Sequence, residues 1–298
     1  MRTQPPRDRW FVLALGGLGF GAASSLGALL AGGRGALAGG VLGLAAAYAL
    51  RLRSGRHEVA RRALLLTPFP DTWRRILVER YDHYDRLPTI LRRRFEDDLR
   101  IFLAEKRITG IGVEKSPELT LLVAASAVTL SLGWPDYEWD QLAEVLLYPQ
   151  DFDRDYSFES ADLAGQAHPW GTVILSVPAL CESFDHPDDA YHVGLHEFAH
   201  LLDVDQTRFD GIPAGLPSRR SAEWVALVEK EQERLRRGKS VLDPYGADDP
   251  AEFLAVAVEA FFEAPLAVRQ RHRELYAMLA QYFGQDPAAW DDARGLAR

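Results

Sequence analysis

The chain has 298 residues, of which 47% are hydrophobic, so it is long enough for one large domain or two smaller ones with a substantial core. The net charge of −9 is uneven, because residues 1–62 carry nine arginines against Asp8 and Glu58, a balance of +7, which leaves −16 on residues 63–298. Such an acidic main part argues against a nucleic-acid partner. A single cysteine, Cys181, excludes an internal disulfide, and we interpret it as a small core residue.

Residues 10–50 form a hydrophobic stretch whose only charge is Arg34. The stretch is too long for one membrane span, and it predicts two helices, at 10–31 and 35–50, that form a hairpin. By the positive-inside rule, the arginines at both ends place these ends in the cytoplasm; they are Arg2, Arg7, Arg9, Arg51, Arg53, Arg56, Arg61 and Arg62. The predicted organisation is therefore a membrane hairpin at 1–62 and a cytoplasmic domain at 63–298. The alternatives are a signal peptide, although the stretch exceeds a usual signal core, and a single span with reversed topology.

The main part of the chain alternates helical and strand patterns after the proline-broken segment LTPFPDTW. Hydrophobic residues at helical spacing predict an amphipathic helix within residues 87–110, and the start signals Ser116 and Pro117 predict a buried helix that ends near Gly133. The runs EVLLYP and GTVILSV predict strands at 144–149 and 171–177. We expect the second strand to be the edge along which an extended peptide pairs.

The segment YHVGLHEFAHLLDVDQ contains the pattern H-E-x-x-H in His196, Glu197 and His200. On a helix the two histidines lie on one face, where both rings can bind one metal ion while the glutamate reaches the attacking water. The alternative is a pair of ordinary core histidines. That alternative does not explain a carboxylate in the same apolar run, because an unpaired buried carboxylate is costly. The pattern therefore favours a zinc site with Glu197 as general base.

A catalytic zinc site usually has a third protein ligand, and two downstream glutamates are candidates. Glu223 belongs to a highly charged helix, where glutamate is expected on the solvent face. Glu252 begins an apolar helix, with Glu259 two turns further along the same face. We favour Glu252, although it could instead complete a capping box with Asp249. Asp203, three residues after His200, could orient a ligand imidazole or lie on the surface.

The segments HEFAHLLD and DPYGADDPAEFLAVAVEAFFEAP resemble the Mlc titration factor A family of bacterial zinc peptidases. The resemblance extends over roughly residues 85–285, and the YG and AEF part is also similar to the catalytic domain of anthrax lethal factor. It implies an α+β, mainly helical, zincin-like metallopeptidase domain with a small sheet and one Zn²⁺. It also implies roles for several residues: His196, His200 and Glu252 as ligands, Glu197 as base, and Tyr245 as hydrogen-bond donor to the oxyanion. His192 stands where we expect a family asparagine; it could support the metal site or fill a helix face.

Two functions follow from these patterns. The first is a zinc peptidase, anchored in the bacterial inner membrane through residues 10–50 with its catalytic domain facing the cytoplasm, that cleaves peptide or protein substrates. The second is a membrane-anchored binding module that sequesters a transcriptional regulator, because the family's namesake is known through contact with a repressor. A binding module has no need of Glu197, so the first function is favoured.

Overall fold

The computed structural model describes residues 59–296, apart from 136, 159–161 and 204–208, and N-terminal to them 25–26, 28–29, 34–46 and 48. The chain divides into two compact units, the larger of which includes Phe69–Arg298. Most of the predicted span at 10–31 lies outside the described residues, and of the one at 35–50, residues 35–46 and 48 are helical. Within the described parts of the chain, no helix combines the length and apolar character that crossing a membrane requires. The transmembrane hairpin stays a prediction.

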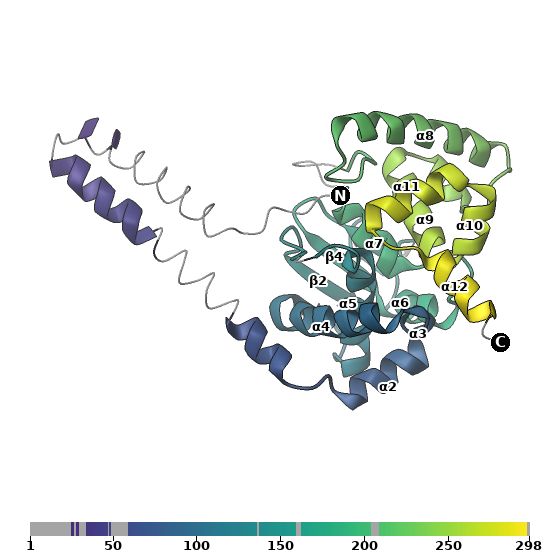
Figure 1. The fold of residues 1–298 in the computed structure, drawn as a ribbon, viewed down its shortest axis with the longest axis horizontal. Coiled ribbons are helices and arrows are strands. Elements are labelled where there is room, and N and C mark those ends of the chain that lie inside the picture. The colour runs from purple at the N-terminus through teal and green to yellow at the C-terminus, as the bar shows by residue number, and fades with distance from the viewer. Residues whose placement is uncertain are drawn as a thin grey trace. The chain divides into compact units, whose positions relative to one another are not determined.

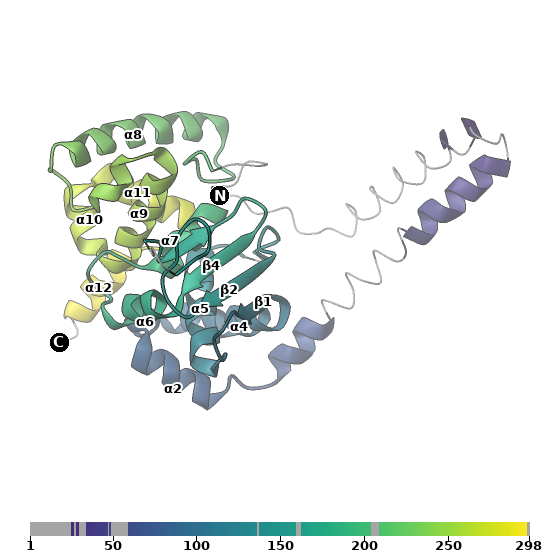
Figure 2. The ribbon, with the colours of Figure 1, turned by 180° about the vertical axis from the view of Figure 1, so that it is seen from behind.

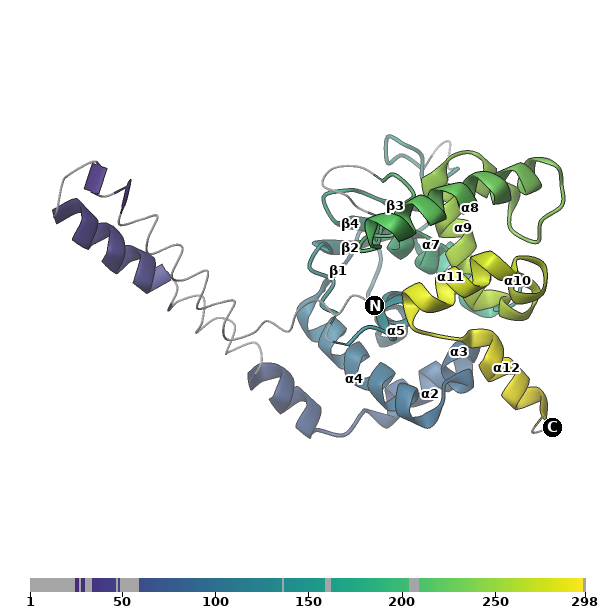
Figure 3. The ribbon, with the colours of Figure 1, turned by 45° about the horizontal axis from the view of Figure 1, so that its top comes forward.

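The larger unit is mainly helical with one small sheet, as the α+β prediction expected (Figure 1). Its N-terminal half contains α2 (Asp71–Arg80), α3 (Asp82–Arg86), α4 (Thr89–Glu105), β1 (Arg107–Gly110), α5 (Pro117–Ser131), β2 (Glu144–Tyr148), β3 (Gly165–Ala167), β4 (Thr172–Ser176) and α6 (Val177–Asp185). Then follow α7 (Val193–Leu201), α8 (Ser218–Arg236), the 3-10 helix η1 (Pro244–Ala247), α9 (Pro250–Glu263), α10 (Pro265–Arg271), α11 (Arg273–Phe283) and α12 (Pro287–Leu296). In all three views the sheet lies on one side of α7 and the C-terminal helices lie on the other (Figures 1, 2 and 3).

The sheet has the strand order β1-β2-β4-β3, with β1, β2 and β4 parallel and β3 antiparallel to β4. The predicted strands at 144–149 and 171–177 are confirmed as β2 and β4. The prediction that the second of these forms the edge was wrong, because β4 lies between β2 and β3. Both edge strands were missed: β1 occupies residues 107–110 of the segment predicted to be helical, and β3 consists of glycine, glutamine and alanine, which carry no alternating hydrophobic pattern.

The helix α5 is the centre of the hydrophobic core and begins where its start signals predict. Ser116 is the N-cap, its hydroxyl accepting a hydrogen bond from the Leu119 N–H at 3.0 Å, and Pro117 is the first helical residue. Every residue from Leu121 to Ser131 is buried. The helix α7 packs closely on α5 because Gly194 has no side chain there; a Cβ at this position would clash with the Ser126 hydroxyl. The H-E-x-x-H helix is thus supported directly by the core.

Candidate metal centre

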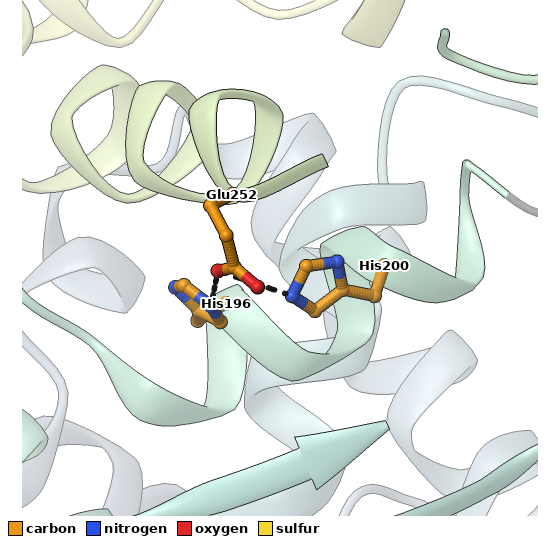
Figure 4. A group of neighbouring side chains, drawn as sticks. All are labelled: His196, His200 and Glu252. Atoms are coloured by element: carbon orange, nitrogen blue, oxygen red, sulfur yellow. Dashed lines mark hydrogen bonds and ion pairs between the residues drawn. The ribbon is translucent and has the colours of Figure 1, made fainter. Parts of the chain in front are cut away.

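The two histidines of the H-E-x-x-H pattern meet Glu252 where α7 packs against α9. Figure 4 shows the Glu252 carboxylate lying between the two imidazole rings. Its Oε2 lies 3.0 Å from His196 Nε2 and 3.7 Å from His200 Nε2. Among the described residues, these three are the one group of at least three potential metal ligands whose donor atoms all lie within 4.8 Å of one another.

The donor atoms suit zinc in both type and spacing. Ligand atoms about 2.1 Å from a tetrahedral ion lie about 3.4 Å apart, close to the two distances from Glu252 to the rings. Two imidazoles and one carboxylate form a common ligand set for catalytic zinc. The side chains of His196 and Glu252 are 13% and 20% exposed. Most of the centre is therefore shielded from solvent, and a small part of these two side chains remains accessible. The residues present therefore fit a zinc ion.

The electrostatics of His196 also favour a cation at this position. Burial alone would lower the pKa of His196, but Glu259 and Glu252 outweigh it and raise this pKa well above its ordinary value. Burial likewise opposes the ionisation of Glu252, yet the hydrogen bonds with His196 and His200 hold its pKa well below its usual range.

Glu259 lies on the far side of the His196 ring and is almost fully buried. Its Oε1 lies 2.7 Å from His196 Nδ1, and its Oε2 accepts a hydrogen bond from the His192 backbone N–H at 2.5 Å. A carboxylate on Nδ1 directs Nε2, the other ring nitrogen, toward the centre. From the sequence, only its position two turns after Glu252 in an apolar helix indicated this placement.

Glu197 is buried beside the edge strand, and burial raises the pKa of its carboxyl despite the neighbouring histidines. It approaches β3 closely at Gly165, where a Cβ would lie 2.6 Å from the Glu197 Oε1 and 2.7 Å from its Cγ. A side chain at residue 165 would therefore displace the carboxylate. Sequence reasoning identified Glu197 but missed Gly165, because the contact joins residues far apart in the chain.

The free side of β3 is defined by its hydrogen bonds. Ser176 N donates to Ala164 O, and His168 N donates to Thr172 O, both at 2.8 Å, so residues 164 and 168 face β4. Because an extended strand alternates, the backbone groups of Gly165 and Ala167 point away from β4. Leu163 also faces this way but is bridged to Phe152 by hydrogen bonds of 2.9 and 3.1 Å. The outer edge of β3 beside Glu197 thus consists of the backbone of Gly165, which is half-buried, and of Ala167, which is buried.

Tyr245 lies on η1, with its ring centroid 6.2 Å from that of His196 and its side chain half-exposed. Burial and the charge of Glu252 raise the pKa of its hydroxyl to about 12, so the hydroxyl remains protonated and able to donate a hydrogen bond. Asp243 is the N-cap of the 3-10 helix that carries it, and its side chain accepts a hydrogen bond from the Tyr245 N–H at 2.8 Å.

The remaining candidates lie elsewhere or act differently. Glu223 lies on α8, 42% exposed, and pairs with Arg219 and Arg220. His192 is the N-cap of α7, with Nδ1 accepting from Leu195 N at 3.2 Å, and burial lowers its pKa to about 3. It therefore fills neither a ligand position nor a charged role. Asp203 is fully buried and binds backbone N–H groups of residues 210–212, so the two expectations for it, an imidazole partner and a surface position, were both wrong.

Comparison with known proteins identifies the family of this chain. The family model described as glucose-regulated metallo-peptidase M90 matches residues 56–284. The chain is 30% identical over 225 residues to Mlc titration factor A of Edwardsiella ictaluri, covering 69% of this chain and 82% of that protein. It is 32% identical over 209 residues to Mlc titration factor A of Escherichia fergusonii, covering 62% and 76%. It is also 29% identical over 240 residues to an uncharacterized protein of Synechocystis, covering 75% and 87%. The similarity to Mlc titration factor A predicted from the sequence is confirmed. The chain therefore belongs to the glucose-regulated metallo-peptidase M90 family.

Proposed function

We propose that this protein is a zinc-dependent peptidase whose ion is held by His196, His200 and Glu252. The observation that carries the proposal is the convergence of these three side chains from α7 and α9, with a buried glutamate beside them and the edge strand β3 next to that glutamate. Bound there, zinc would lower the pKa of a water molecule and polarise the scissile carbonyl.

In this proposal Glu197 transfers protons, Tyr245 stabilises the oxyanion and β3 binds the substrate. Glu197 takes the proton of the attacking water and later delivers a proton to the leaving amine, a dual role that its raised pKa supports. The Tyr245 hydroxyl donates a hydrogen bond to the oxyanion that develops on the substrate carbonyl. An extended substrate pairs its backbone with Gly165 and Ala167 on β3, which replaces β4 as the proposed binding edge. Main-chain pairing of this kind tolerates different sequences.

The test combines metal analysis of the full chain with hydrolysis of an unstructured peptide. We expect about one zinc per chain and activity that a chelator removes and zinc restores. Glu197→Gln should keep the zinc and lose about 10²- to 10⁴-fold in rate, the usual contribution of a general acid and base. Glu223→Gln, on the exposed face of α8, is the matched control and should retain full activity. Zinc-loaded protein that cleaves none of a broad peptide library would refute the peptidase.

A second function, binding of a transcriptional regulator, is supported by the name of the relatives, Mlc titration factor A. It does not exclude the first. We propose that the same domain would bind a repressor related to Mlc through its surface, with no need of proton transfer at Glu197. A Glu197→Gln protein that still binds such a repressor but hydrolyses nothing would separate the two functions. Loss of both binding and hydrolysis would mean that repressor binding depends on the same residue as hydrolysis.

We further propose that residues 10–50 anchor the protein in the bacterial inner membrane, with the metallopeptidase domain of residues 63–298 in the cytoplasm. The support is the long uncharged stretch and its arginine flanks; the family match begins at residue 56 and leaves this stretch outside. A reporter fused after residue 62 should behave as cytoplasmic. A periplasmic reporter signal at that position would overturn this topology.

A further inference from the structure

Asp203 lies just after the C-terminal end of α7, three residues beyond His200, and is fully buried. Its carboxylate accepts three backbone hydrogen bonds from one short segment: from Asp210 N at 3.2 Å, Gly211 N at 2.8 Å and Ile212 N at 3.0 Å. Burial raises the pKa of this carboxyl to about 7 although the Gly211 N–H opposes the shift, so the three bonds, and not charge alone, hold the segment. The segment 210–212 is therefore tied to the end of the H-E-x-x-H helix.

The same segment packs against the first residue of α9. Gly211 has φ +77°, and a Cβ there would lie 2.5 Å from the Pro250 Cβ and clash with the Pro250 backbone. On its other side, the Gly211 carbonyl accepts a hydrogen bond of 2.6 Å from Trp224 Nε1 on α8. A residue with a side chain would fit neither the backbone conformation nor the space. Gly211 is thus held by contacts with Asp203, Pro250 and Trp224.

These contacts connect the two helices that carry the three proposed ligands. Pro250 is the first residue of α9, and Glu252 is the third. Asp203 follows His200 by less than one helical turn. The contacts of Gly211 with Asp203 and Pro250 therefore join the end of α7 to the start of α9, the same two helix ends that carry His200 and Glu252. A displacement of the segment 210–212 would move the start of α9 relative to α7. Metal sites require their ligands to be held within about 0.5 Å of the productive geometry.

We propose that Asp203 is a positioning residue that, through Gly211 and Pro250, sets the separation between Glu252 and the two histidines. Among the described residues, its carboxylate forms no hydrogen bond with a side chain of the three ligands; its backbone N–H donates to the His200 carbonyl at 3.0 Å, and Asp203→Asn leaves that bond in place. The proposed effect of the carboxylate passes through the segment 210–212. The inference rests on the proposed metal centre. It predicts that the coordination geometry, and not merely the stability of the fold, depends on Asp203.

The test uses the full chain loaded with zinc or, for spectroscopy, with Co²⁺. Asp203→Asn keeps the size of the side chain but replaces one acceptor oxygen with an NH2 donor. That donor must face either the Gly211 N–H or the N–H groups of Asp210 and Ile212, so at least one of the three bonds is lost. We expect zinc affinity, measured by competition with a chelator, to fall about 10- to 100-fold, the usual effect of losing a group that supports metal ligands. The visible absorption of bound Co²⁺ should change as well, because that absorption reports the arrangement of the ligands around the ion.

Glu231→Gln is the control, because Glu231 is equally buried but pairs with His272, away from this segment. It should lower the melting temperature and leave both the zinc affinity and the Co²⁺ spectrum unchanged. Trp224→Phe removes the hydrogen bond to Gly211 O and should alter the Co²⁺ spectrum in the same direction as Asp203→Asn, but less.

Wild-type zinc affinity and Co²⁺ spectrum in folded Asp203→Asn would overturn the inference. If Asp203→Asn does not fold, an unchanged Co²⁺ spectrum in Trp224→Phe would overturn it instead. Failure of the wild-type chain to bind zinc or Co²⁺ would refute the proposed metal centre itself, an outcome distinct from both.

Discussion

The buried His272 and the largely buried His196 both pair with glutamate, and their surroundings differ. His272 Nδ1 lies 2.6 Å from Glu231 Oε2, and its Nε2 lies 3.2 Å from the Ser240 hydroxyl, while Arg234 pairs with Glu231 at 2.9 Å. His196 instead has a carboxylate on each ring nitrogen, Glu259 on Nδ1 and Glu252 on Nε2, and a second imidazole approaches the same Glu252 oxygen.

The difference separates a structural pair from a metal centre. Around His272, each polar atom has a protein partner and the negative charge is matched by an arginine. On the Nε2 side of His196, Glu252 and a second imidazole converge, and a cation between these three groups would satisfy them together. A buried His–Glu pair by itself therefore does not indicate a metal; the convergence of a third donor atom does. The following predictions test this distinction, in order of decreasing effect.

Removal of Glu252 should have the largest effect. We expect Glu252→Ala to lose stoichiometric zinc and all hydrolysis, because two imidazoles alone hold the ion poorly. Elemental analysis of the purified variant checks this. Glu223→Ala, in which an exposed glutamate is removed, should keep its zinc. If Glu223→Ala lost the metal and Glu252→Ala kept it, the third ligand would lie on α8 and not on α9.

Tyr245→Phe should retain zinc but slow hydrolysis by about 10²- to 10³-fold, the usual effect of removing an oxyanion donor. Steady-state kinetics should show the loss in kcat, since the donor acts mainly in the transition state. Tyr276→Phe on α11 is the control, because its hydroxyl donates to Asp286 at 2.5 Å, outside the proposed site. Equal rates for Tyr245→Phe and the wild type would remove Tyr245 from the mechanism.

Glu259→Gln should weaken zinc binding by about 10- to 100-fold without abolishing it, because the amide no longer carries the negative charge beside His196 Nδ1. Chelator competition on the folded variant measures this. An unchanged zinc affinity would mean that Glu259 serves only to cap the backbone at His192 and that His196 is oriented without it.

Glu231→Gln should leave zinc content unchanged and destabilise the fold by about 1 to 3 kcal/mol at neutral pH, the usual cost of disrupting a buried charged hydrogen bond. Burial raises the pKa of Glu231, but the hydrogen bond with His272 and the charges of His272 and Arg234 outweigh burial and lower this pKa below its ordinary 4.5. The stability that the carboxylate contributes is therefore fully present above pH 4.5 and is lost as the pH falls through the lower folded-state pKa. Denaturation of both proteins at neutral and acid pH should show the difference shrinking in acid; a difference independent of pH would contradict the ion pair.

Local patterns were sufficient for much of the fold and for the candidates at the site. Helical spacing and the Ser116 and Pro117 start signals predicted α5, and β-rich runs predicted β2 and β4. The four-residue spacing of His196 and His200 and the apolar surroundings of Glu252 singled out the three residues that the structure brings together. Each of these signals depends on neighbours within a few turns of the same chain segment.

Contacts between distant segments had no such signal. The edge strand β3 is three residues long, and its place beside β4 depends on pairing that no local pattern encodes. The closeness of Gly165 to Glu197 and the bond from Glu259 to His196 also join separate elements.

By itself, the sequence determined the types of the main elements, the helical face shared by His196 and His200, and the chemistry that these side chains favour. The tertiary structure decided which carboxylate approaches both rings, that β3 forms the sheet edge beside Glu197, and that Asp203 binds residues 210–212 and not an imidazole. The physical reason is that helical periodicity and capping arise from interactions within a few residues, whereas strand order and the packing of α7 against α9 depend on how the whole core is filled.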